Sequence, residues 1–181
     1  PSFAENASCV TFFGTLEGIF SFFAASTHRW DVLIEHTGMS VKRLSTTRWS
    51  AHYAAVKPVK DKFGECMAAI EALCDPSENL DTRGTAQGLL HAVGDFTFIC
   101  YLYLWADLLE EVNLTQQYLQ TKGLTLDKVV TKLEALRLFL YEKRSHLVEH
   151  AISAGTFKIR PIWNFGRKKI KVQEENGGGT T

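Results

Sequence analysis

The stretch Phe96–Ala106 reads FTFICYLYLWA and is the most membrane-like part of the 181-residue chain. It is eleven residues long, and the acidic residues Asp95 and Asp107 flank it. A membrane-spanning helix needs about 20 apolar residues, so we interpret this stretch as part of a buried core helix. We therefore predict no transmembrane segment in the chain.

Apolar residues recur at helical spacing on both sides of this stretch, which predicts an all-α fold built as a bundle of long helices. A long central helix is expected over Arg83–Gln120, and Gly94 in its middle is expected to mark a close helix crossing. Gly123 ends this segment. A fourth long helix is expected over Leu126–Ile152.

The N-terminal half follows the same period. A helix is expected over Ala7–Ala25, with a strand as the alternative for its Phe-rich run alone. A short helix capped by Thr27 is expected to end near Gly38. After a connector over Thr37–Thr46, the next helix carries one apolar stripe and a kink caused by Pro58 near Val56–Lys57. The stripe consists of Trp49, Tyr53, Val56, Phe63, Met67, Ile70 and Leu73, and a loop over Asp75–Thr82 follows it.

The composition is that of a globular domain, with 45% hydrophobic and 22% charged residues. It excludes a disordered chain, a collagen and a coiled-coil rod. The net charge is zero, but residues 26–62 carry a net charge of +4, residues 63–119 of −8 and residues 120–181 of +6. Such blocks can form separate basic and acidic faces, or they can intermix in the folded chain.

The cysteines indicate an intracellular protein with reduced, buried thiols. None of the four has C-x-x-C spacing, and all lie in apolar, helix-like contexts. Cys66 and Cys74 with His52 are a poor zinc set, because the two cysteines lie eight positions apart within one helix. The chain starts at Pro1 without a basic n-region, so we expect a piece of a longer protein and no secretory signal.

Several phrases together resemble one protein family. The phrase KRLSTTRWSA at Lys42–Ala51 is similar to the L-S-x-T-R-W-S-A signature of hAT-superfamily transposases and their domesticated relatives. The run Phe12–Phe23 with Trp30 precedes it. Five later phrases resemble the helical region of MYM-type zinc finger protein 1-like and repressor-of-kinase-inhibitor proteins. These phrases are Phe96–Trp105, Leu108–Leu109, Leu119–Gln120, Leu124–Leu140 and Arg144. The resemblance covers residues 9–155.

The resemblance implies that this chain is the all-helical insertion of a ribonuclease H-like transposase core. In that family three carboxylates hold two metal ions for phosphodiester chemistry. The first two acids lie upstream of the matched region, with a C-x-x-H element, and the third lies downstream. No acid of this chain falls in a matching motif, so we assign no catalytic residue and expect no cleavage of DNA by the chain alone.

Arg48 and Trp49 are the matched residues with a chemical role. In active relatives the matching tryptophan is implicated in stacking on a base flipped out of the duplex, and an arginine can hold a phosphate. The alternative is that Trp49 packs in the core and that Arg48 pairs with an acid.

Three other groups are candidates with a structural alternative. His28-Arg29-Trp30 could form a basic aromatic patch or pack on the fold. Asp107, Glu110 and Glu111 could bind a divalent ion or form a solvated acidic face. Arg167, Lys168 and Lys169, with Lys171, could bind phosphate or act in nuclear import, or form a solvated tail.

These observations predict two regions, a helical transposase-like insertion domain over residues 1–155 and a flexible, partly disordered basic tail over residues 156–181. The expected function is that of a non-catalytic fragment of a domesticated transposase that supports DNA binding or nuclear assembly. The alternatives are a protein–protein scaffold without DNA binding and part of an active transposase. The candidate partners are DNA, other proteins and a second copy of the chain, with no membrane or small-molecule substrate. We expect no cofactor in this chain, with a divalent metal only in a catalytic parent, and a nuclear location.

Overall fold

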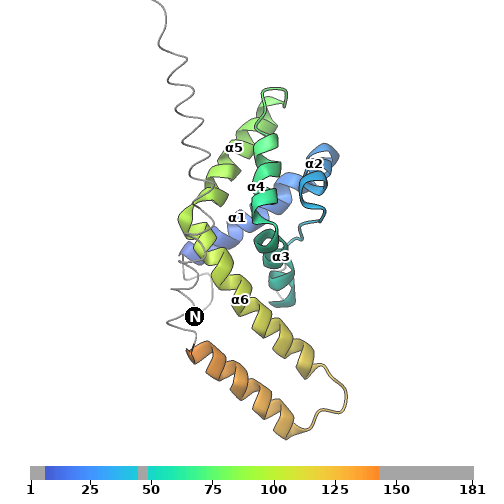
Figure 1. Ribbon diagram of the computed structural model, residues 1–181, viewed down its shortest axis with the longest axis vertical. Helices are drawn as coiled ribbons and strands as arrows, with labels where there is room; N and C mark the ends of the chain where they lie inside the picture. The colour runs from blue at the N-terminus through green and yellow to red at the C-terminus, as the bar shows by residue number, and fades with distance from the viewer. Residues whose placement is uncertain (1–6, 45–48, 143–181) are drawn as a thin grey trace, which may run out of the picture.

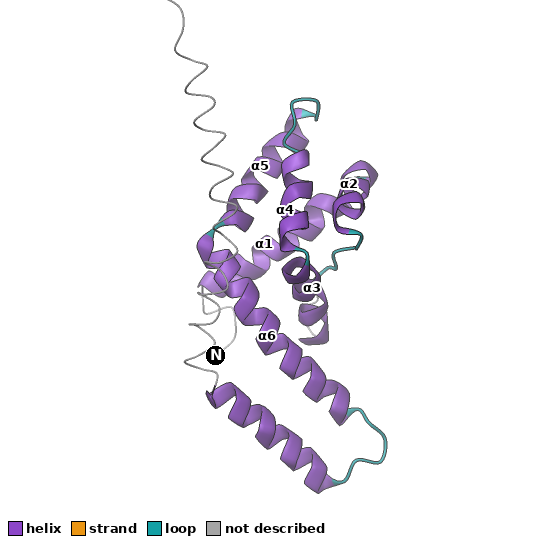
Figure 2. Cartoon of the chain, viewed as in Figure 1, coloured by secondary structure: helices purple, strands orange, loops and turns teal. Residues whose placement is uncertain are grey.

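The computed structural model describes residues 7–44 and 49–142, and helices account for most of them (Figure 1; Figure 2). The helices are α1 (Ala7–Ala24), α2 (Thr27–Thr37), α3 (Trp49–Asp61), α4 (Phe63–Ala72), α5 (Leu80–Gly94) and α6 (Phe96–Leu119). A further helix covers residues 126–142. These described residues contain no strand, so the predicted all-α fold is confirmed and the Phe-rich run of α1 is helical.

The hydrophobic core forms where α1 passes behind α4, α5 and α6 (Figure 1). From α1 it contains Phe12, Leu16, Ile19 and Phe23, spaced at three and four residues, as an amphipathic helix requires. Full burial of a side chain of this size contributes about 1.5–3 kcal/mol. The helix α3 lies along α6, and α4 contacts both α2 and α5.

Among the described residues, α1 is the only single helix with the length and hydropathy of a membrane span. α5 and α6 pass the same test only as a pair, across a bend of 66°. Phe12, Ile19 and Phe23 of α1 lie in the core of the bundle. A third of this span is buried inside the structure.

The expectation of a single central helix over Arg83–Gln120 is wrong, because this stretch forms two helices, α5 and α6. The break lies at Asp95, whose φ and ψ of −66° and 136° are extended. Its carboxylate accepts hydrogen bonds from the backbone N–H groups of Thr97 at 2.8 Å and Phe98 at 3.3 Å. These N–H groups have no partner within the helix, so capping favours a new start over continuation.

Gly94 ends α5 and does not mark the close helix crossing that we expected. A methyl group built on its Cα would meet the Met67 Cε at 3.8 Å, which is an ordinary van der Waals contact. The position therefore tolerates a side chain.

The kink expected near Val56–Lys57 is displaced toward the C-terminus. α3 continues through Pro58 to Asp61, and the break lies at Lys62, where φ is −118° and ψ is 36°. A proline removes the backbone donor of its own residue, but its carbonyl still accepts from Lys62 N at 3.0 Å. The turn after Pro58 therefore forms before the chain bends into α4.

Two helix starts also differ from expectation. Ser26 occupies the N-cap position of α2, and Thr27 is already helical. α5 starts at Leu80 inside the expected loop, because the Asn79 side chain accepts from Thr82 N at 2.8 Å. The expected stop at Gly38 is confirmed, since its φ of 67° suits glycine.

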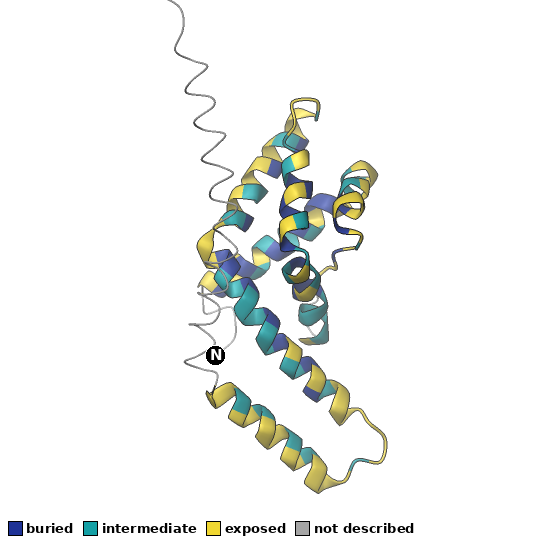
Figure 3. Cartoon of the chain, viewed as in Figure 1, coloured by how far each residue is buried: buried dark blue, intermediate teal, exposed yellow. Residues whose placement is uncertain are grey.

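Residues 110–142 form a two-helix arm that extends beyond the core (Figure 3). The last residue of α6 in the core is Leu109, and the buried residues beyond it are the polar Asn113 and Thr115. Lys132 Nζ lies 3.0 Å from Glu111 Oε1 and ties the two helices together. No residue of the helix over 126–142 is buried. The expected end of this helix at Ile152 and the expected domain boundary at residue 155 both lie outside the described residues.

The Asp95 cap gives a first prediction. Replacing Asp95 with Ala leaves Thr97 N and Phe98 N without their carboxylate partner, so the free energy of unfolding should fall by about 1 kcal/mol. Urea unfolding followed by circular dichroism measures this change. Asp31→Ala, at an exposed position of α2, is the matched control and should change it by less than about 0.5 kcal/mol. Equal effects of the two substitutions would contradict the role given to the cap.

Candidate nucleic-acid interface

Trp49 is the first residue of α3, and 44% of its surface is exposed. The alternative in which it packs in the core is therefore wrong. Its ring is tilted by 42° against the His52 imidazole, with 5.9 Å between the ring centroids. A position at a helix start leaves the aromatic ring accessible from solvent while the backbone is held by the helix.

An aromatic ladder connects Trp49 to the bundle. The His52 imidazole meets the Phe13 ring edge to face at 5.2 Å, and Phe13 meets Trp105 at 5.3 Å. The rings come from α3, α1 and α6, and each such pair contributes about 0.5–1.5 kcal/mol beyond its buried area. Spacing along the sequence could not reveal this ladder, because its members lie far apart in the chain.

Of the five residues predicted to bind nucleic acid, only Trp49 lies within the described residues. Arg48, Arg167, Lys168 and Lys169 lie outside them. Of this predicted set, the structure therefore describes only the aromatic group.

The segment that leads toward Trp49 is anchored to α1. Glu17 Oε1 accepts from Arg43 Nε at 3.1 Å, and Glu17 Oε2 accepts from Leu44 N at 3.2 Å. One carboxylate thus binds both a side chain and the backbone of the KRLSTTRWSA phrase. The Arg43 side chain remains 74% exposed.

The basic block over residues 26–62 is intermixed with acidic residues in the described part of the chain. Most of its cations form ion pairs within 4 Å, so they do not build a broad basic face. An exposed pair of this kind contributes at most about 1 kcal/mol to stability, but it makes the electrostatic potential around the cation less positive. The pairs are Arg29–Asp81, Arg43–Glu17, Lys57–Asp61, Lys60–Asp107 and Lys62–Glu65.

The acidic group on α6 is engaged by neighbouring helices. Asp107 pairs with Lys60 at 3.8 Å, and Glu111 pairs with Lys132 at 3.0 Å. Glu110 Oε1 accepts from Tyr53 Oη at 3.2 Å, and burial together with this bond raises the pKa of Tyr53. Within residues 7–44 and 49–142, no three His, Cys, Asp or Glu side chains are arranged to hold a metal ion.

Arg29 and Trp30 pack on the fold, as the structural alternative predicted, whereas the His28 side chain is 62% exposed and its Nε2 lies 2.7 Å from Glu78 Oε1. The Arg29 guanidinium lies 4.8 Å from the Phe22 ring centroid and donates to the Phe22 carbonyl and to Thr82 Oγ1. Only 13% of its side chain is exposed. Trp30 packs edge to face on Phe20. This site joins α1, α2 and α5 and presents no open cation.

The four cysteines form no disulfide in the described structure. Cys9 and Cys66 are buried, and Cys74 and Cys100 are half-buried. Burial, with a smaller effect from Glu65, raises the pKa of Cys66 to about 12. A thiol in this environment is inert at neutral pH.

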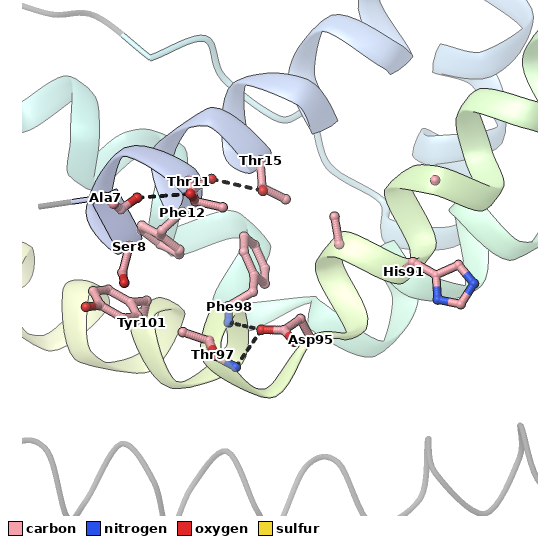
Figure 4. Close-up of a pocket in the computed structure, with 12 residues that line it drawn as sticks. Ala7, Ser8, Thr11, Phe12, Thr15, His91, Asp95, Thr97, Phe98 and Tyr101 are labelled. Carbon is pink, nitrogen blue, oxygen red and sulfur yellow. Dashed lines mark hydrogen bonds between the residues drawn. The ribbon is translucent and has the colours of Figure 1, made fainter. Parts of the chain in front are cut away.

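A cavity of about 650 Å³ lies between α1, the end of α5 and the start of α6 (Figure 4). Phe12, Phe98 and Tyr101 line its apolar side. The Thr11 hydroxyl donates to the carbonyl of Ala7 in its own helix, and Asp95 caps α6. The volume is in the range of ligand pockets, but these polar groups already serve the fold and do not converge on a ligand. The sequence pattern does not reveal this cavity, because the cavity depends on the break at Asp95.

The chain matches no protein-family profile, no curated protein sequence and no solved structure. The resemblance to transposon-derived proteins therefore rests only on the phrases quoted above.

The Cys66 thiol gives a second prediction. Because its pKa is about 12 in the folded chain and about 9.0 in the reference state, unfolding releases a proton between these values. The contribution of Cys66 to stability is therefore complete below pH 9 and is lost as the pH rises toward 12. The free energy of unfolding should fall by up to about 1.4 kcal/mol per pH unit from this group.

Urea unfolding between about pH 8 and pH 10.5 measures this slope. Cys66→Ala removes the thiol and should give a shallower slope than the native chain, although it lowers stability at every pH. Cys100→Ala is the comparison at a half-buried thiol whose pKa burial also raises, and it should flatten the slope less than Cys66→Ala does. Parallel pH profiles of the native chain and Cys66→Ala would contradict the assignment.

Proposed function

We propose that this chain is a non-catalytic helical domain of a domesticated hAT-like transposase, and that it supports DNA binding or assembly in the nucleus. The proposal draws on the ordered set of family-like phrases and agrees with the all-α architecture of the described residues. The catalytic carboxylates and their divalent metal ions would lie elsewhere in the parent protein. A parent that holds all three carboxylates would be an active transposase, which is the alternative for the longer chain.

The observation that carries the DNA-binding function is the exposure of Trp49 at the first turn of α3. An exposed aromatic ring on a rigid support can stack on an unpaired base, and such stacking contributes about 1–3 kcal/mol per base. The support is the ladder through His52, Phe13 and Trp105. Arg48 precedes Trp49 directly and is the proposed phosphate contact.

The ion pairs in residues 26–62 favour one mode of binding within this proposal. With Lys57, Lys60 and Lys62 held by acidic partners, few cations of the described residues are free to displace counterions from DNA. The proposed contact is therefore local, with stacking as the main contribution. It favours unpaired or distorted DNA over an intact duplex, where bases are covered by their neighbours.

A second candidate function is a protein–protein scaffold without DNA binding. The arm favours it, because residues 110–142 leave large apolar side chains in solvent and bury only polar groups on α6. Apolar side chains gathered in this way on an extended element are typical of a partner surface.

A DNA titration tests the first candidate. Binding of the chain to a single-stranded oligonucleotide should weaken about 5- to 150-fold in Trp49→Ala, which is the loss of one stacked base. Fluorescence anisotropy at several salt concentrations measures it. The dependence on salt should stay nearly unchanged in Trp49→Ala, whereas Arg48→Ala should reduce the slope by about one phosphate contact.

Tyr141→Ala, at an aromatic side chain that is 74% exposed on the arm, is the matched control and should bind like the native chain. Unchanged affinity and salt slope in both Trp49→Ala and Arg48→Ala would refute this site. Light scattering separates the two candidates, since a stable oligomer without DNA affinity supports the scaffold.

A further inference from the structure

The apolar surface of the arm is concentrated on the helix over 126–142. Isolated helices of this length are marginal in water, and packing of an apolar face normally stabilises them. Yet this helix has no buried residue. The exposed apolar residues of the arm are Leu114, Tyr118, Leu119, Leu126, Val130, Leu133, Leu138, Leu140 and Tyr141, with exposed fractions from 36% to 77%.

Two different stripes run along this helix. Val129, Lys132, Leu136 and Phe139 are half-buried, and the Lys132–Glu111 ion pair shows that this stripe faces α6. The other is exposed and consists of Leu126, Val130, Leu133 and Leu140, which we call the leucine stripe. Its residues are spaced at four, three and seven, with Arg137 at the remaining position. This spacing is typical of a helix face that packs against another helix, and α6 does not cover this face.

We propose that the leucine stripe pairs antiparallel with the same stripe of a second copy of this chain, so that two arms form a four-helix bundle. The inference deepens the second candidate function, on which it rests, by naming the partner. Leu126, Leu133 and Leu140 are seven residues apart and therefore symmetric about Leu133. In an antiparallel pair Leu133 meets Leu133 of the other copy, and Leu126 meets Leu140. A twofold contact requires this kind of self-complementary surface.

The charges also fit a second copy. The register that pairs Leu126 with Leu140 brings Asp127 of one helix within two residues of Arg137 of the other. Within each copy Arg137 Nε donates to Glu134 Oε2 at 2.9 Å, so the cation on the stripe is already partly neutralised. The remaining positions of the stripe carry no charge. Like charges therefore do not oppose the contact, and Asp127 and Arg137 favour the antiparallel direction.

The available area predicts a weak dimer. A helix of 17 residues is about 25 Å long and, with side chains, about 10 Å wide, so the stripe alone covers about 250 Å² per copy. A specific interface buries about 800 Å² per partner. The α6 half of the arm, with exposed Leu114 and Tyr118, must therefore contribute as well. Even then the interface remains below the standard size, so we expect a weak, transient dimer.

Sedimentation velocity of the whole chain from about 10 µM to about 1 mM tests the proposal. The native chain should shift from monomer to dimer over this range. Leu133→Asp places two carboxylates at the twofold axis and should raise the dissociation constant at least about 10-fold. Leu80→Asp, at a leucine that is 76% exposed outside the arm, is the matched control and should dimerise like the native chain.

Because 45% of Leu133 is already exposed, its substitution should leave the helical circular dichroism signal intact. A monomer at every concentration would overturn the proposal, as would a dimer that Leu133→Asp does not weaken. Neither result depends on DNA. Failure of the oligonucleotide titration is therefore distinguishable from failure of self-association.

Cysteine cross-linking tests the register. Under mild oxidation, an equimolar mixture of Leu126→Cys and Leu140→Cys chains should form disulfide dimers that join the two different variants. Leu126→Cys alone should cross-link slowly, because its own position lies about 20 Å away in the antiparallel pair. The native chain sets the background from its four cysteines. Faster cross-linking of Leu126→Cys with itself would show a parallel pair and overturn the proposed arrangement.

Discussion

The arrangement of this bundle depends on one local interaction, the capping of α6 by the Asp95 carboxylate. By capping α6 it divides the most apolar part of the chain from α5 and sets the 66° bend between the two helices. α6 can then leave the layer of α4 and α5, pack along α3 and continue past the last core residue, Leu109. The same bend opens the cavity beside Phe12 and Tyr101.

Helical periodicity predicted the fold class and most helices, because burial of one face is encoded locally. Ala7–Ala24 and the stop at Gly38 follow from spacing and backbone preference alone. The breaks were harder. Asp95 follows Gly94, and apolar residues lie on both sides of this pair. The apolar pattern therefore predicts one continuous helix and does not reveal that Asp95 caps a new one. At Lys62 the bend occurs four residues after Pro58, because the proline carbonyl still accepts a backbone hydrogen bond.

The candidate site could be predicted only in part. The Thr-Arg-Trp phrase identified Trp49, but its burial depends on what α1 and α6 place beside it, which spacing does not contain. Trp49 belongs to an apolar stripe, yet the first turn of α3 projects beyond the core while Val56 and Val59 lie inside it. The ion pairs of Lys57 and Lys60 likewise depend on tertiary contacts or on rotamers. Block charges along the sequence therefore gave a poor estimate of surface potential.

The bidentate contact of Glu17 has a consequence for recognition. Glu17 holds Arg43 and Leu44 at one end of the KRLSTTRWSA phrase, and His52 contacts Trp49 near its other end. The rotational freedom of these groups is lost when the chain folds, before any ligand arrives. If DNA contacts Trp49 as proposed, these existing contacts of Arg43, Leu44 and Trp49 would reduce the part of the binding free energy that is consumed in ordering side chains.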